Sequence, residues 1–474
     1  MARRSVAVEF FCGPPLSGNA RRTFRLHLGY ALLDATAGGI LLNAPIVAIK
    51  AFQAANWHLP LRELFAGIGM IASLYLGVRM ARRAKMPFVF IPGVLAGICS
   101  VSMAAATGSA FWFLTLLGFG AMLEIIARPA ITSILRLNYP VDHRGHAVGE
   151  VRKWSSLAFV VSSVLSAWLL HWGAGHARPA SGVEPGLLGG GGLQWSADHM
   201  AQMLMVLAGL LNLASFLCFR QIRVEEDLSI RRCDLPRGIG SSFREALRVL
   251  TAGNGRFRRY LLGCFLDGFC QMLYLPLIWV FLSRDLGFGY VGCSVLMHAV
   301  PALAAFAATG ALGRVLDRTN PWISWSWIRG LWGLDAILLA ATPVCAAVFP
   351  PALVALPVLG RLLRGSVQGA WWIMWWQVGV TYFAPPGEDT SRYMGVMVFL
   401  NGAIRLLASA AGMVLAAASV PPGVLLLAGG LGVVLSGAYS LWQASWERRH
   451  RGPETMTEFE HRWNGEGREA SRLD

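Results

Sequence analysis

Residues 93–117 read GVLAGICSVSMAAATGSAFWFLTLL and carry no formal charge. An apolar run of about 20 residues spans roughly 30 Å of hydrocarbon as a helix that rises about 1.5 Å per residue. The rest of the chain has the same character: of its 474 residues, 55% are hydrophobic and 14% are charged, and the mean hydropathy is +0.52. Ordinary soluble domains contain about 25% charged residues. The sequence therefore predicts a protein embedded in a lipid bilayer.

Apolar runs bounded by turn residues and charges predict twelve membrane-spanning helices in two groups of six. The first group lies near residues 26–50, 62–80, 87–107, 110–137, 147–171 and 200–219. The second group lies near residues 259–283, 290–313, 322–343, 352–383, 393–418 and 422–444. The predicted fold is an all-α polytopic membrane protein, divided into an N-terminal segment 1–25, a first bundle 26–219, a linker 220–258, a second bundle 259–446 and a tail 447–474.

The distribution of positive charge indicates the orientation. Lys and Arg are concentrated in residues 1–25, in the linker 220–258 and in alternate loops, whereas the other side has little beyond Arg178 and Arg284. Because loops rich in Lys and Arg stay in the cytoplasm, both termini are expected on the cytoplasmic side of a cell inner membrane. This distribution accounts for the formal net charge of +15 without a nucleic-acid partner.

Several landmarks recur in the same order in both halves. Pro140–Gly149 reads PVDHRGHAVG after the fourth predicted span, and Pro386–Gly395 reads PGEDTSRYMG after the tenth. The first and seventh spans match around Asp34 (YALLDATAGG) and Asp267 (CFLDGFCQM). Duplicated halves are a common construction of secondary transporters, so this pattern favours that class.

The loops after the second and eighth spans also correspond. They read GVRMARRAKMP from Gly77 and GRVLDRTNP from Gly313, and each places an arginine at the same distance from its glycine. At these residues the chain resembles the major facilitator superfamily. Its loop signature is similar to the segment with Gly313, Asp317 and Arg318. The turn after its fourth helix is similar to the segment with Pro140, Arg144, Gly145 and Gly149.

The resemblance implies two pseudo-symmetric six-helix bundles around a central cavity lined by the first, fourth, seventh and tenth helices. The chain departs from the family signature at Ala81, where the first copy would have an aspartate. A gate that uses that charge must then depend more on the second copy and on basic partners. The expected gating residues are Gly313, Asp317, Arg318, Arg82, Arg144 and Arg152.

Ionisable side chains inside the spans are the first candidates for transport, because a charge in hydrocarbon costs several kcal/mol. Asp34 lies roughly 12 Å along its predicted helix, and Asp267 is placed similarly in its own. Each could bind a proton or a cationic group of the solute, or bond to a neighbouring helix. Gln271 and Tyr274 follow Asp267 on the same helix face. By the resemblance, the two aspartates face each other across the cavity.

Further polar and aromatic side chains complete the candidate set. Glu124 and Arg128 are spaced to pair on one face of the fourth span, as a breakable switch or a permanent bridge. Arg405 could complement an anionic solute or Asp267, or pair structurally. Trp372 could stack on a ring, hold a cation or fill a helix contact. The remaining candidates are Arg364, Gln368 and Asn401, whereas Arg329 and Asp335 on the ninth span are expected to pair between helices.

The sequence thus predicts a secondary active or facilitative transporter of a small organic solute, a symporter or antiporter in which H⁺ is a candidate coupling ion. No HExxH, GxxxxGK[ST], paired CxxC or GxSxG motif stands in a usable setting, so no catalytic residue, metal site or cofactor is expected. The expected partners are the solute and membrane lipid, and the expected state is a monomer. The alternatives are a non-transporting sensor or assembly factor on a transporter scaffold, or a polytopic membrane transferase.

Overall fold

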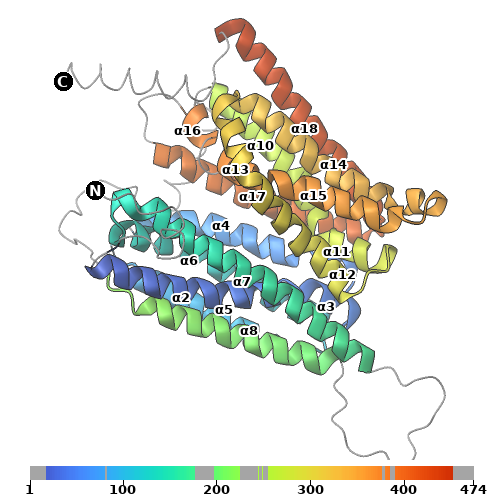
Figure 1. Ribbon diagram of the computed structural model, residues 1–474, viewed down its shortest axis with the longest axis horizontal. Helices are drawn as coiled ribbons and strands as arrows, with labels where there is room; N and C mark the ends of the chain where they lie inside the picture. Colours follow the sequence, from blue (N-terminus) through green and yellow to red (C-terminus); the bar gives the residue numbers. More distant parts are fainter. Residues whose placement is uncertain are drawn as a thin grey trace, which may run out of the picture. The chain divides into compact units, whose positions relative to one another are not determined.

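The computed structural model describes residues 16, 18–80, 83–176, 197–224, 244, 248, 255–375, 379–384 and 390–451. Regular secondary structure in this part of the chain is entirely helical (Figure 1). The first half contains α2 (Gly18–Leu41), α3 (Ala44–Lys50), η1 (Asn56–His58), α4 (Leu61–Met80), α5 (Met86–Ser102), α6 (Ala110–Asn138), α7 (Val141–His176) and α8 (Ala197–Arg220). The second half contains α10 (Gly255–Tyr274), η2 (Leu275–Leu277), α11 (Ile278–Val280), η3 (Phe281–Asp285), α12 (Tyr290–Ser294), η4 (Val295–Ala299), α13 (Val300–Arg318), α14 (Pro321–Val348), α15 (Ala352–Ile373), α16 (Gly379–Phe383), α17 (Thr390–Ala417) and α18 (Pro422–Arg451).

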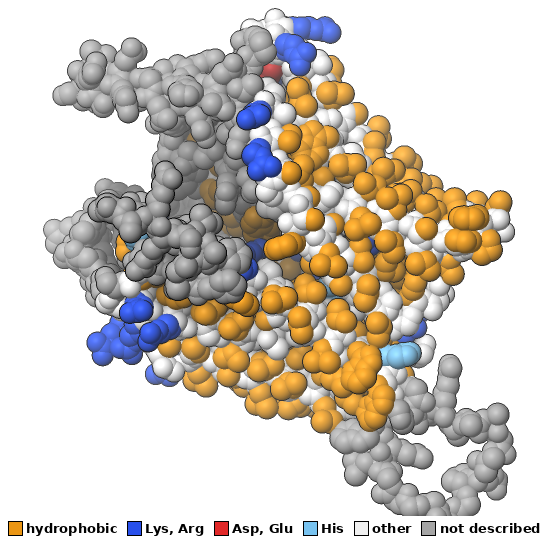
Figure 2. Space-filling view, viewed as in Figure 1, with side chains coloured by type: hydrophobic (Ala, Val, Ile, Leu, Met, Phe, Trp, Pro, Cys, Tyr) orange, Lys and Arg blue, Asp and Glu red, His pale blue; other side chains and the backbone are white. Residues whose placement is uncertain are grey.

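Among the described residues, 10 helices are long and apolar enough to cross a membrane. The shorter apolar helix α5 and the 22-residue helix α15 take the other two predicted positions. Large apolar side chains remain exposed, such as Phe306 at 85% and Val348 at 88%. Figure 2 shows hydrophobic side chains over most of the visible helix surface. Such a surface suits hydrocarbon, and the predicted all-α polytopic membrane fold is confirmed.

Several predicted spans consist of shorter helical pieces joined at prolines. The span predicted at 26–50 is divided into α2 and α3, and Pro45 lies in the first turn of α3. The span predicted at 259–283 continues from α10 through the 3₁₀ turn η2, which contains Pro276, into α11 and the π-helix η3. Proline removes a backbone donor and clashes with the preceding turn, which favours a break in the helix at these positions.

The contacts divide the chain into two compact units. The first unit comprises Met1–His58, Tyr75–Pro236 and Gly289–Ser294, and the second comprises Leu59–Leu74, Arg237–Phe288 and Val295–Asp474. Compared with the predicted bundles, the first part of α4 groups with the second unit and α12 groups with the first.

In the first unit, α2 packs against α7 and α8, and α5 packs against α6 and α8 (Figure 1). The side chain of Asn43, at the break between α2 and α3, donates from Nδ2 to the Ser163 carbonyl at 2.7 Å and to Ser166 Oγ at 2.9 Å on α7. These bonds satisfy the buried side-chain nitrogen of Asn43 where the helix is interrupted. They fix the break against α7.

In the second unit, α14 packs against α15 and α18, α10 packs against α17 and α18, and α13 packs against α15. Gly333 on α14 and Gly430 on α18 let their helices approach closely: a Cβ atom added at Gly333 would lie 2.6 Å from the Gly430 carbonyl oxygen. Small residues at such crossings are typical of membrane helices, which associate mainly through close packing.

Gly333→Val is therefore expected to lower the free energy of unfolding by about 1–3 kcal/mol, because the added side chain forces α14 away from α18. Thermal unfolding of the purified protein in detergent measures the effect. Gly330→Val on the same helix is the matched control, since a Cβ atom at Gly330 meets no atom within 4 Å. Equal losses for the two variants would contradict the close crossing.

Candidate functional site

The first unit brings three of the predicted site residues together. Asp34 on α2 interacts electrostatically with Glu124 and Arg128 on α6. Asn212 on α8 donates from Nδ2 to Glu124 Oε1 at 2.9 Å. Asp34 and Glu124 are partly exposed and Arg128 is exposed. Two acids and one arginine thus lie within two membrane-spanning helices, and none of the three is sealed inside the protein.

Two further side chains extend this group, named here the Asp34 cluster: Tyr30, Asp34, Glu124, Arg128 and Asn212. Tyr30 precedes Asp34 by one helical turn and interacts with the same charges. Arg152 on α7, a predicted gating residue, lies close enough to Arg128 for their charges to repel. Carboxylates that lie close together repel when both are charged, so one proton taken up between Asp34 and Glu124 relieves that repulsion.

In the second unit, Asp267 on α10 is fully buried, with a hydrogen bond to one carboxylate oxygen and an ion pair at the other. Gln271 donates from Nε2 to Asp267 Oδ1 at 2.7 Å, as their spacing predicts. Arg329 Nε on α14 lies 3.5 Å from Asp267 Oδ2. Arg329 also donates to Ser440 Oγ at 2.5 Å and lies over the Trp325 ring at 4.5 Å. This geometry favours the alternative in which Asp267 bonds to a neighbouring helix.

A second buried ion cluster lies between α14 and α15 and is named here the Asp335 cluster: Asp335, Arg361 and Arg364. Arg361 donates from Nη2 to Asp335 Oδ2, and Arg364 Nη1 lies 3.8 Å from the same oxygen. The Arg364 guanidinium lies over the Trp332 ring at 4.5 Å. The inter-helix pairing expected for Arg329 and Asp335 is therefore observed.

Three of the predicted residues form a stripe along α15. Arg364, Gln368 and Trp372 are four residues apart in turn and so share one face. Exposure increases along the stripe: the Arg364 side chain is 13% exposed, Gln368 is exposed and Trp372 is 42% exposed. The neighbouring Trp371 stacks on Trp375 at 5.0 Å.

On α17, Asn401 is buried and Arg405 pairs with Glu63 at the start of α4. Glu63 is 7% exposed and also accepts from Arg62 Nη1 at 2.7 Å. The sequence left open a pairing of Arg405 with Asp267. The structure instead pairs Arg405 with Glu63. Glu63 was missed because it stands at the edge of a predicted span, where a carboxylate is ordinarily solvated.

Replacing Glu63 with glutamine is expected to cost about 3 kcal/mol of unfolding free energy, since Arg405 then loses its carboxylate in a largely buried setting. The double variant Glu63→Gln with Arg405→Gln should lose less than the sum of the two single variants. Chemical denaturation in detergent measures all three. Additive losses would show that the interaction between Glu63 and Arg405 does not contribute to the free energy of unfolding.

The gating residues are only partly visible in the described chain. Gly313 and the exposed Arg318 lie on α13, whereas Arg82 and the Asp317 side chain lie outside the described residues. Arg144 donates from Nη2 to the carbonyls of Arg136 at 2.7 Å and Tyr139 at 3.3 Å, which caps the end of α6. Their gating roles stay predictions.

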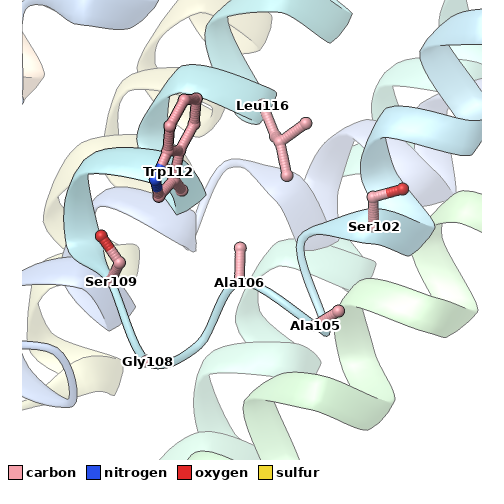
Figure 3. Close-up of a pocket in the computed structure, with 7 residues that line it drawn as sticks. All are labelled: Ser102, Ala105, Ala106, Gly108, Ser109, Trp112 and Leu116. Atoms are coloured by element: carbon pink, nitrogen blue, oxygen red, sulfur yellow. The ribbon is translucent and has the colours of Figure 1, made fainter.

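A pocket of about 380 Å³ lies where α5 ends and α6 begins (Figure 3). Its lining contains no charged side chain and none of the predicted site residues: Ser102, Ala105, Ala106, Gly108, Ser109, Trp112 and Leu116. A solute site needs polar groups that fix its orientation, and the side-chain donors in this lining are two serine hydroxyls and the Trp112 indole N–H. The charged clusters are therefore the stronger candidate site.

The family model for the Major Facilitator Superfamily matches residues 26–409. No curated protein matches the chain. Among solved structures, a bacterial homologue of the human lysosomal transporter Spinster, inward-facing and unoccupied, matches with 16% identity and a TM-score of 0.57 over 91% of this chain and 96% of that chain. The nucleoside transporter NupG matches with 12% identity and a TM-score of 0.59 over 89% and 97%. A D-xylose–proton symporter matches with 14% identity and a TM-score of 0.59 over 88% and 96%.

Proposed function

Because the chain belongs to the Major Facilitator Superfamily, we propose that this multi-pass membrane protein is a proton-coupled secondary transporter of a small organic solute. The observation that carries the proton coupling is the Asp34 cluster, in which two carboxylates share one neighbourhood inside membrane-spanning helices. A D-xylose–proton symporter among the similar structures is consistent with such coupling.

The proposed cycle alternates access to a site near the middle of the membrane. The bundles at 26–219 and 259–446, joined by the linker at 220–258, move against each other. A proton on Asp34 or Glu124 removes one negative charge from the Asp34 cluster and so changes its attraction to Arg128. That change biases the carrier between its two states, as coupling to a proton gradient requires.

Asp267 is proposed as a positioning residue in this cycle. Its ion pair with Arg329 holds α10 against α14, and the bond from Gln271 on the same helix fixes the orientation of the carboxylate. An ion pair of this kind keeps both charges satisfied in a setting without water. Proton coupling is therefore assigned to Asp34 and Glu124.

The proposed orientation places both termini in the cytoplasm of a cell inner membrane. Exposed arginines near the start of α2 and near the end of α18 support it: Arg21, Arg22, Arg25, Arg448 and Arg449. Clusters of Arg at helix ends stay on the cytoplasmic side during insertion.

Reconstituted liposomes with an imposed pH gradient test the proposal. We expect at least one solute from a panel of sugars, nucleosides, amino acids and organic acids to accumulate, and the accumulation to vanish when an ionophore collapses the gradient. Protein-free liposomes are the control. Movement of no panel solute in either direction would contradict the transport function.

A further inference from the structure

The interior of the second unit contains more arginine than acid at the Asp335 cluster. Asp335 is 0% exposed and carries one negative charge, whereas Arg361 and Arg364 each carry a positive charge. Asp267 cannot supply the missing charge, because it is already paired with Arg329. One positive charge is therefore in excess in a buried setting, which is costly unless an anion balances it.

Unsatisfied polar atoms gather at the same place. Within the described chain, three donors of this group have no hydrogen-bond partner, namely Arg361 Nε, Arg364 Nη1 and the Tyr274 hydroxyl, although Arg364 Nη1 lies within ion-pair distance of Asp335. One acceptor, Asp335 Oδ1, also has none. Tyr274 is 0% exposed and interacts electrostatically with both arginines and with Asp335. The three unpaired donors outnumber the one unpaired acceptor, so this cluster can satisfy a further acceptor such as a carboxylate.

The stripe on α15 gives this cluster a route to its surroundings. Arg364 is the partly exposed member of the Asp335 cluster, and Gln368 follows it on the same face. An exposed amide on a membrane-spanning helix is unfavourable against lipid, so this face is better suited to an aqueous cavity. Trp372, one turn further, supplies an apolar surface beside the polar one.

The surroundings of Arg364 differ from those of Arg128 in the first unit. Arg128 has two acids beside it, whereas Arg364 shares a single carboxylate with Arg361.

We propose that the transported solute is a small monovalent organic anion and that Arg364 binds its carboxylate, with the Tyr274 hydroxyl as a second donor. Arginine is suited to this task because its planar fork donates two parallel hydrogen bonds to a carboxylate. This inference rests on the proposed function and specifies the class of its substrate.

Matched probes that differ in charge test the class in the purified full-length protein. Two trios are benzoate, benzamide and benzylammonium, and butyrate, butyramide and butylammonium. Thermal unfolding and titration calorimetry in detergent measure binding. At least one carboxylate is expected to bind, and its amide and amine are expected not to.

Arg364→Gln tests the residue. It is expected to weaken carboxylate binding by about tenfold or more, the loss of one charge-assisted hydrogen bond or more. Arg448→Gln, which removes an exposed positive charge on α18, is the matched control and should leave binding unchanged. Without ligand, Arg364→Gln should not lower the unfolding temperature, because the charge removed is the excess one.

The inference is overturned if amides or amines bind in place of carboxylates, if no probe binds, or if Arg364→Gln binds carboxylates as well as the natural chain. A lowered unfolding temperature with unchanged binding would show that Arg364 is only a structural partner of Asp335. Transport of a neutral or cationic solute would leave the proposed function standing and overturn the anion class. Binding of carboxylates without any translocation would leave the anion class standing and overturn the proposed transport function.

Discussion

Asp335→Asn is expected to be the most destabilising single change in the second unit, with a loss of about 3–5 kcal/mol in the free energy of unfolding. The change keeps the shape of the side chain and removes its charge. Arg361 and Arg364 would then be buried beside each other with no carboxylate between them. The residue cannot move aside to reach water, because it is 0% exposed and Gly360 of α15 packs directly against it.

Chemical denaturation in detergent, followed by tryptophan fluorescence, measures this loss. Asp198→Asn, an exposed acid in the first turn of α8, controls for the loss of a carboxylate in general. The double variant Asp335→Asn with Arg361→Gln should recover part of the stability, since it removes one of the two unpaired guanidinium groups. A loss below about 1 kcal/mol for Asp335→Asn would mean that the ion pair contributes little to the fold.

Asp34→Asn is expected to have the largest effect on transport. Asparagine keeps the size and polarity of the side chain and cannot take up a proton. Accumulation driven by a pH gradient should fall to the level of protein-free liposomes, whereas exchange of labelled for unlabelled solute should continue, because exchange needs no net proton movement. Glu124→Gln should behave in the same way, since both acids belong to the Asp34 cluster.

The same exchange assay separates coupling from folding. A variant that fails to fold loses exchange as well as accumulation, and Asp198→Asn should lose neither. Retained accumulation against the gradient in Asp34→Asn would remove Asp34 from the coupling mechanism. Loss of both activities with an unchanged unfolding temperature would place Asp34 in solute binding instead.

The sequence predicted the fold well, because membrane-spanning helices are identified by local composition. The span predicted at 62–80 corresponds to α4 at Leu61–Met80, and the span at 200–219 corresponds to α8 at Ala197–Arg220. The breaks within the predicted spans were harder to predict. Pro45 and Pro276 are visible in the sequence, but membrane helices often tolerate proline when neighbouring groups satisfy the freed backbone. At one of these breaks the Asn43 side chain bonds to α7, a partner far along the chain that no local pattern specifies.

The sequence predicted which residues belong to the candidate site, but it did not predict which of them form ion pairs and hydrogen bonds with each other. The bond from Gln271 to Asp267 follows from helical spacing, because residues four apart share a face. The pairs Asp267–Arg329 and Glu63–Arg405 join helices far apart in the chain, and no local pattern specifies them. A charge inside a span signals that a partner exists, but only the packing of the helices identifies that partner.

Proton movement measured inside liposomes tests proton coupling at Asp34 and Glu124 most directly. A pH-sensitive dye trapped with the reconstituted protein reports protons that cross together with an added solute, without an imposed gradient. The natural chain is expected to shift the internal pH when solute is added, and Asp34→Asn and Glu124→Gln are expected to give no shift while still exchanging solute. Solute accumulation by the natural chain with no change in internal pH would contradict the coupling.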